Sequence, residues 1–152
     1  MSVDTLPQEG SCRCDRVRFS VSAAPVITMA CHCRGCQKMT ASAFSLSALF
    51  AAEAFTVTQG CPVIGGLHGV DRHYMCPHCM SWLFTRPHGI DAFVNVRATA
   101  LENASGYVPF METWTSEKLP WANTPAVEHF AQLPEPHDFP RLMQAYADYS
   151  AR

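Results

Sequence analysis

Seven of the eight cysteines in this 152-residue chain fall into three tight groups, and their spacing limits what the chain can fold around. A disulfide cannot usefully close loops this short, whereas a tetrahedral metal ion binds neighbouring thiolates. The sequence therefore predicts a metal-binding protein rather than a disulfide framework. The three groups are Cys12-x-Cys14, Cys31-x-Cys33-x-x-Cys36 and Cys76-x-x-Cys79.

The composition indicates one small domain with a hydrophobic core. Apolar residues make up 48 % of the chain, enough for one core in 152 residues. The net charge is −2 and the basic residues are scattered, which disfavours nucleic acid as a partner. No apolar stretch is long enough to span a membrane, and the polar N-terminus does not look like a signal peptide. We therefore expect a cytoplasmic protein with no membrane partner.

Apolar residues alternate with polar ones along several short segments, as is typical of β-strands. Eleven prolines and eight glycines separate these segments, as a β domain requires. Only Pro140–Tyr149 has the spacing of a helix. The sequence thus predicts a mainly β domain over residues 1–132 and a C-terminal extension, 133–152, with a short helix. The predicted strand segments are Val17–Val21, Phe44–Phe50, Phe55–Val57, Trp82–Phe84 and Val94–Val96.

The first and last cysteine pairs together can form a closed four-thiolate site. A C-x-C pair on an extended segment places both thiols on one face, and a C-x-x-C turn brings its two sulfurs together. Zinc suits four thiolates best, and an iron–sulfur cluster is the lesser alternative. We expect this site to hold the fold together, because it joins segments far apart in the sequence. We call Cys12, Cys14, Cys76 and Cys79 the outer cluster.

The middle group, which we call the inner cluster, offers three thiols: Cys31, Cys33 and Cys36. Three protein ligands leave the fourth position of a zinc ion open for water or substrate, the pattern of catalytic sites. The alternative is that a fourth protein ligand closes this site as well. The candidates for that ligand are Cys61, His32, His68, His73 and His78.

An open zinc site with three thiolates favours sulfur chemistry. Three thiolates give the ion a net charge of −1, so it is a weak Lewis acid and activates water poorly. A thiol that enters the fourth position becomes a thiolate nucleophile at neutral pH. The sequence therefore favours an enzyme that adds a thiol to an aldehyde. The alternative is a non-catalytic, zinc-stabilised protein-binding module in which both metals serve only the fold.

Four motifs stand out in the sequence: Gly10-Ser11-Cys12-Arg13-Cys14, Cys31-His32-Cys33-Arg34-Gly35-Cys36-Gln37-Lys38, Ala41-Ser42-Ala43-Phe44 and Tyr74-Met75-Cys76-Pro77-His78-Cys79. Together they strongly resemble the glutathione-dependent formaldehyde-activating enzyme family, which includes centromere protein V. The resemblance runs from Gly10 to Trp121. It implies a small complex-β fold, the β-tent, with a structural zinc on the outer cluster and a catalytic zinc on the inner cluster. It also implies a carbon–sulfur lyase that forms S-(hydroxymethyl)glutathione from the small molecules glutathione and formaldehyde.

The chain departs from the family pattern at several glycines, and three positions near the cysteines bear on the predicted sites. Asp15 and Met80 stand where a glycine usually follows each outer pair, and Ala41 replaces the glycine before Ser42. The departures at Asp15 and Met80 predict altered geometry at the turns that carry the outer cluster, whereas Ala41 lies near the expected pocket.

Three residues beside the inner cluster are candidates for binding substrate. Arg34 and Lys38 flank the open site and suit substrate carboxylates, the alternative being solvated surface charge. His32 lies between two ligands and is a candidate for touching the substrate or closing the metal site. On a strand, however, its side chain would point away from the metal. The oligomeric state is not predicted.

Overall fold

The computed structural model describes residues 5–65 and 69–152, and it confirms the prediction of a mainly β protein with a short C-terminal helix. The chain forms two compact units, neither of them continuous in sequence. The first unit comprises Met1–Pro25 and Ala48–Tyr107, and the second comprises Val26–Ser47 and Val108–Arg152. The predicted boundary between residues 132 and 133 stays a prediction. In the described part of the chain, no helix is long and apolar enough to cross a membrane.

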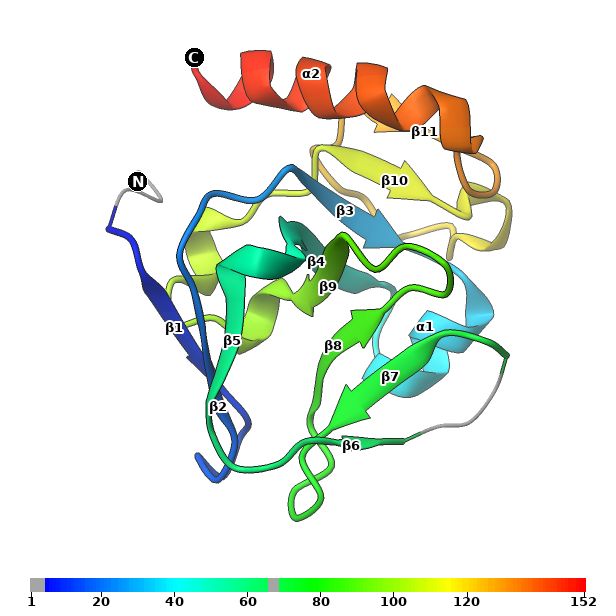
Figure 1. The fold of residues 1–152 in the computed structure, drawn as a ribbon. Helices are drawn as coiled ribbons and strands as arrows, with labels where there is room; N and C mark the ends of the chain where they lie inside the picture. The colour runs from blue at the N-terminus through cyan, green and yellow to red at the C-terminus, as the bar shows by residue number, and fades with distance from the viewer. Residues whose placement is uncertain (1–4, 66–68) are drawn as a thin grey trace. The chain divides into compact units, whose positions relative to one another are not determined.

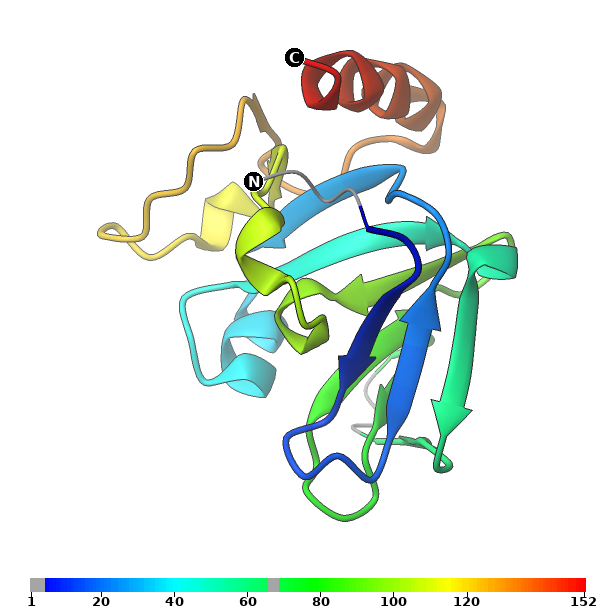
Figure 2. The same ribbon diagram turned by 90° about the vertical axis from the view of Figure 1, so that its left-hand side faces the viewer.

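The first unit contains a three-stranded antiparallel sheet in the order β1 (Gln8–Ser11), β2 (Arg18–Val21) and β5 (Phe55–Gln59). Figure 2 shows the three strands side by side. In β2 the side chains of Phe19 and Val21 are buried and the alternate residues are half-buried, which confirms the predicted strand.

The same unit also contains a run of antiparallel strands: β6 (Val63–Ile64), β7 (Arg72–Met75), β8 (Trp82–Arg86) and β9 (Phe93–Arg97). Aromatic rings from both sets of strands form its core. Phe55 lies 5.4 Å from Phe19 and 4.7 Å from Phe84, between ring centroids, and Phe84 stacks on Tyr74 at 4.7 Å. Such ring pairs stabilise the core beyond the area that they bury.

The second unit is organised around β10 (Met111–Thr113), which pairs in parallel with both β3 (Ile27–Cys31) and β11 (Glu128–His129). Helix α1 (Arg34–Thr40) follows β3, and β4 (Ser45–Ala51) then carries the chain into the first unit. Short 3-10 helices complete both units: Ala52–Ala54, Ala98–Ala100, Ala104–Gly106, Thr115–Glu117 and Pro136–Asp138.

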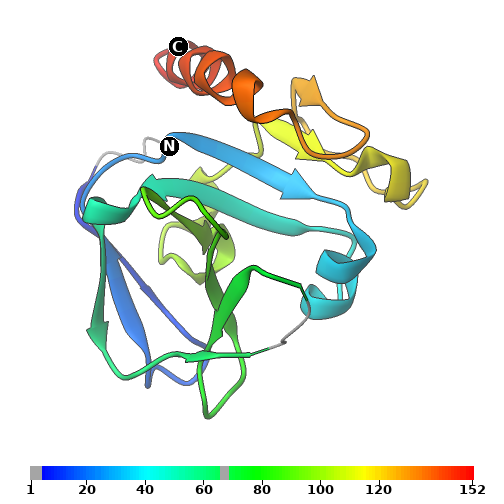
Figure 3. The ribbon, with the colours of Figure 1, turned by 45° about the vertical axis from the view of Figure 1, so that its right-hand side comes forward.

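Helix α2 (Phe139–Ser150) packs against the rest of the second unit, where Figures 1 and 3 show it running alongside β3 and β10. The predicted helical spacing is correct: Leu142 is fully buried, and the rings of Tyr146 and Tyr149 lie 5.5 and 5.3 Å from that of Phe110. Pro140 stands in the first turn, where its missing N–H has no helical partner to lose.

The predicted strand at β4 exists, but its buried face differs from the expected one. Alternation suggested that Leu46 shares a buried face with Phe50, yet Ser45 and Ser47 are buried and Leu46 is only half-buried. From Ser47 to Phe50 every side chain is buried, so this stretch is covered on both faces. A strand buried on both faces cannot be assigned an inner face from alternation.

The three positions that lack the family's glycine all have left-handed backbone. The φ angles are 61° at Asp15, 59° at Met80 and 51° at Ala41. Glycine adopts this conformation without strain, whereas a side chain costs roughly 1–2 kcal/mol there. At all three positions the turn therefore has the conformation that suits glycine, formed by a residue whose side chain strains it.

We predict that Met80→Gly stabilises the protein by about 0.5–1 kcal/mol, because glycine removes the left-handed strain. The Met80 side chain is 59 % exposed, so its loss removes little packing. Met80→Ala is the matched control, since alanine removes the same exposed side chain but keeps Cβ and the strain. Urea unfolding of the metal-loaded protein measures both, and an equal gain from Ala and Gly would contradict the prediction.

Candidate metal centres

The four sulfur atoms of the outer cluster converge within the first unit, all within 4.8 Å of one another. Cys14 Sγ lies 3.6 Å from Cys12 Sγ and 3.8 Å from Cys76 Sγ. A Zn–S bond of about 2.3 Å makes the edge of a tetrahedron about 3.8 Å. The four residues thus have the identity and spacing to hold a tetrahedral metal ion.

Two tight turns build the outer cluster. Cys12 and Cys14 lie in the turn between β1 and β2, and Cys76 and Cys79 lie in the turn between β7 and β8. In these turns backbone N–H groups point at the sulfurs: Val17 N donates to Cys12 Sγ at 3.3 Å and His78 N to Cys76 Sγ at 3.4 Å. Such amide donors stabilise thiolate charge.

Sequence reasoning missed Ser81, which links the two turns of the outer cluster. Its hydroxyl oxygen accepts a hydrogen bond from Arg13 N at 3.1 Å and lies 3.2 Å from Cys79 Sγ. The hydrogen bond from this hydroxyl lowers the pKa of Cys79 to about 5, against the opposing effect of burial. A serine two residues after a C-x-x-C pair is too common on turns to have signalled this role.

The inner cluster forms in the second unit, where the sulfurs of Cys31, Cys33 and Cys36 also lie within 4.8 Å of one another. Cys31 ends β3, and Cys33 is the N-cap of α1, with its sulfur accepting a hydrogen bond from Cys36 N at 3.3 Å. Helix α1 was not predicted. Its seven residues are too few for a periodic signal, and its cap is a cysteine rather than the usual Ser, Thr, Asp or Asn.

The three thiols of the inner cluster differ in acidity. A hydrogen bond donated by Cys36 lowers the pKa of Cys31 to about 5, more than burial raises it. The same hydrogen bond, together with burial, raises the pKa of Cys36, and burial raises the pKa of Cys33. Without a metal ion the cluster therefore favours one thiolate, at Cys31. A bound cation would displace the remaining protons and favour all three thiolates.

His32 separates two residues of the inner cluster and is fully buried, with 0 % of its surface exposed. It lies between the end of β3 and the N-cap of α1, and its Nε2 lies 2.9 Å from Glu112 Oε1. Its backbone N–H donates to Thr113 O at 3.0 Å, and its C=O accepts from Gln37 Nε2 at 2.7 Å. This position differs from the expected substrate contact, because no part of the residue is open to a ligand.

No fourth protein ligand joins the inner cluster among the described residues of the second unit. In the first unit, His73 pairs through Nδ1 with the Thr85 hydroxyl at 2.9 Å, while Cys61 and His78 are exposed. The remaining candidate, His68, lies outside the described residues. Within its own unit the inner cluster therefore differs from the outer one, which has four cysteines.

A groove with a volume of about 470 Å³ runs along α1 in the second unit. Arg34, Gln37 and Lys38 recur at helical spacing and share the face that lines it, whereas Cys36 lies on the opposite side of the helix. Two basic side chains, Arg34 and Lys38, line the groove, and no acidic side chain does. Trp121, 70 % exposed, forms part of the far wall. The full lining is Arg34, Gln37, Lys38, Ala41, Ser42, Ala43, Leu119 and Trp121.

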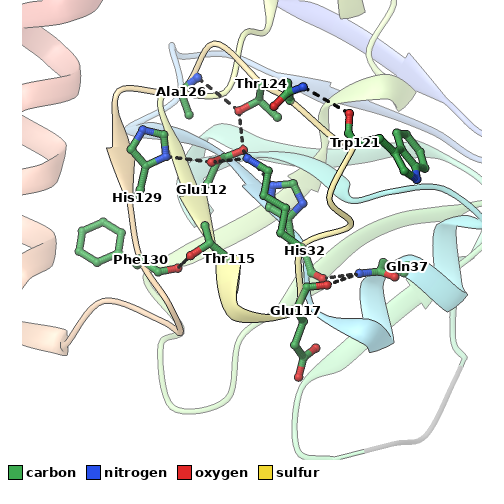
Figure 4. Close-up of polar contacts among 12 residues, drawn as sticks. His32, Gln37, Glu112, Thr115, Glu117, Trp121, Thr124, Ala126, His129 and Phe130 are labelled. Carbon is green, nitrogen blue, oxygen red and sulfur yellow. Dashed lines mark hydrogen bonds and ion pairs between the residues drawn. The ribbon is translucent and has the colours of Figure 1, made fainter.

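The segment that carries this wall is tied to α1 by Glu117. Its backbone C=O accepts from Gln37 Nε2 at 3.0 Å, and its carboxylate accepts from Arg34 N. Figure 4 shows Glu117 beside Gln37 and His32. Sequence reasoning missed Gln37, Glu117 and Trp121 as part of this site, because only the fold brings residues near 117–121 to the helix that begins at Arg34.

Comparisons with known proteins agree with this arrangement. The family model described as glutathione-dependent formaldehyde-activating enzyme matches residues 7–117, well over half of the chain. A search of curated proteins returned no match. A crystal structure of a Rhodobacter sphaeroides protein, a structural genomics target, is similar with a TM-score of 0.55 at 19 % identity. The similarity covers 69 % of this chain and 99 % of that chain, and at this identity it shows the fold alone.

We predict that Cys14→Ser lowers the midpoint of thermal unfolding by about 10 °C or more, and Cys36→Ser by less than half as much. The outer cluster joins Cys14 to a residue 62 positions away, so metal loss there frees a long loop, whereas the inner cluster spans six residues. Calorimetry with elemental analysis of bound metal tests this. Equal shifts for the two variants would mean that both clusters serve the fold alike.

Proposed function

Since the chain belongs to the glutathione-dependent formaldehyde-activating enzyme family, we propose that the inner cluster is its reaction site and that the protein adds a thiol to a small aldehyde. In this reaction the thiol sulfur attacks the aldehyde carbon and forms the C–S bond. The carbonyl oxygen takes up a proton as the thiol loses its own, so that the product is a hydroxymethyl thioether. The enzyme is then a carbon–sulfur lyase, with glutathione and formaldehyde as the substrates that the family implies.

The observation that carries this proposal is the contrast between four converging thiols and three. We propose a structural zinc ion at the outer cluster and a catalytic one at the inner cluster, two per chain. Zinc on three thiolates would supply a soft Lewis acid with a free position for a thiol sulfur. A binding module with two purely structural zinc ions would instead need a fourth protein ligand, and the described part of the second unit offers none.

Each residue of the site has a proposed role. Cys31, Cys33 and Cys36 hold the metal, and the groove along α1 binds the rest of the thiol substrate. Arg34 and Lys38 bind its carboxylates, since both line the groove. Because Cys36 lies on the opposite side of α1, the substrate would have to pass the N-terminal end of the helix, where Arg34 follows Cys33 directly.

We predict that Cys33→Ser abolishes the activity, by at least about 100-fold, while the fold is retained. Serine keeps an N-cap for α1 but replaces one of three metal ligands. Exchange NMR of an equilibrated mixture of glutathione and formaldehyde measures the catalysed rate above the spontaneous one. Cys61→Ser is the control, because Cys61 is exposed and belongs to neither cluster. An unchanged catalysed rate in Cys33→Ser would contradict the proposal.

We predict that the double change Arg34→Ala and Lys38→Ala raises the KM for glutathione about 10-fold, the effect of roughly 1.4 kcal/mol in binding. The KM for a neutral thiol such as 2-mercaptoethanol should stay the same, because that thiol has no carboxylate to bind. Arg141→Ala, a charge removed from α2 in the same unit, is the matched control. An equal rise in the KM for both thiols would show that Arg34 and Lys38 do not bind the substrate carboxylates.

A further inference from the structure

The carboxylate of Glu112, on β10, is the most densely hydrogen-bonded group of the second unit's described residues, although it is only 1 % exposed. Four side chains contact its two oxygens, as Figure 4 shows for the three that it labels. The four contacts are His32 Nε2 at 2.9 Å, Lys118 Nζ at 3.0 Å, Thr124 Oγ1 at 2.8 Å and His129 Nδ1 at 2.8 Å.

These contacts keep the buried carboxylate charged. Burial alone would raise the pKa of Glu112, but the hydrogen bonds from Thr124, Lys118, His129 and His32 outweigh it and lower the pKa to about 2. An ionised carboxylate can only accept hydrogen bonds. The contact from His32 must therefore be an N–H donated by Nε2, which fixes the tautomer and the plane of that ring.

Stability alone does not explain a charged group at this place. Burying a carboxylate costs free energy, and replacing a buried ion pair by well-packed apolar side chains is often neutral or stabilising. A buried charge of this kind can instead serve to specify one geometry of the residues around it. The geometry that it specifies includes His32, the residue between two metal ligands, whose backbone N–H and C=O are also held by hydrogen bonds.

We propose that Glu112 is a positioning residue for the reaction site. By holding the His32 side chain, it fixes the peptide between Cys31 and Cys33, so that their sulfurs keep the separation that one metal ion requires. This role rests on the proposed function only in that it takes the inner cluster as the reaction site.

Most of the donors to Glu112 come from a part of the chain beyond the family match, which ends at residue 117. Lys118, Thr124 and His129 all follow it, and His129 belongs to β11. The segment 118–129 thus completes the sheet and also positions the Glu112 carboxylate, which in turn supports the inner cluster. The same segment carries Leu119 and Trp121 of the groove, so the contacts of Glu112 also help to place the groove wall.

The test compares the release of the two zinc ions from the full-length protein to a chromogenic chelator. Glu112→Gln keeps the size of the side chain and removes its charge, whereas Glu112→Asp keeps the charge and shortens the side chain by one methylene. Cys33→Ser, which retains only the outer cluster intact, identifies the outer ion. Tyr107→Phe is the matched control, because it breaks a buried hydrogen bond, to Gln8 Oε1 at 2.6 Å, in the first unit.

We expect both Glu112 variants to release the inner ion about 10-fold or more faster and the outer ion at the wild-type rate. The visible absorption of Co²⁺ in the inner site should change as well, whereas Tyr107→Phe should alter neither property. Wild-type release rates and an unchanged cobalt spectrum in both Glu112 variants would overturn the proposal, even if unfolding shifts. If only Glu112→Asp behaves as wild type, a carboxylate on a shorter side chain suffices, so the position of the group does not matter and the proposal also fails.

Should the Glu112 variants fail to fold, Thr124→Val removes a single donor and leaves the carboxylate charged. We expect it to release the inner ion about threefold faster, and an unchanged rate would overturn the proposal. These readouts do not depend on catalysis. A wild-type protein without thiol–aldehyde activity would defeat the proposed function, while the zinc and cobalt measurements would still decide the role of Glu112.

Discussion

The convergence of thiol groups is the constraint on which the rest of this structure depends. Sulfur atoms less than 4.8 Å apart cannot all carry negative charge unless a cation or several hydrogen-bond donors balance them. Both clusters sit where backbone N–H groups supply part of that balance, at two tight turns and at the N-cap of a helix.

The two clusters are built differently, which matches the different roles proposed for them. The outer cluster joins turns that are distant in the sequence, so a metal there acts as a cross-link of the first unit. The inner cluster is local: all three cysteines lie within six residues, and its geometry depends on what holds that short segment. In the second unit this support comes from β10, through Thr113 O on the backbone of His32 and Glu112 on its side chain.

Particular elements show which parts of the fold a local sequence pattern can predict. Alternation located β2, β5, β8 and β9, and helical spacing located α2. In β2 and α2 the reason is plain, because each buries one face or stripe. The same reasoning misassigned the buried face of β4, which is covered on both faces, and missed α1, whose cap is a thiol. At Asp15, Met80 and Ala41 the sequence departs from glycine, yet the turn still requires left-handed backbone.

The two thiol clusters that could hold metal ions were determined by the sequence itself, since C-x-C and C-x-x-C spacings bring thiols together through geometry that spans only a few residues. The family relationship follows from the same motifs. Only the tertiary structure decided how His32 is held and which side chains share the groove with Arg34. The His32–Glu112 contact joins residues 80 positions apart, and no local periodicity encodes a pair at that separation. The fold alone decides which residue pairs with Glu112.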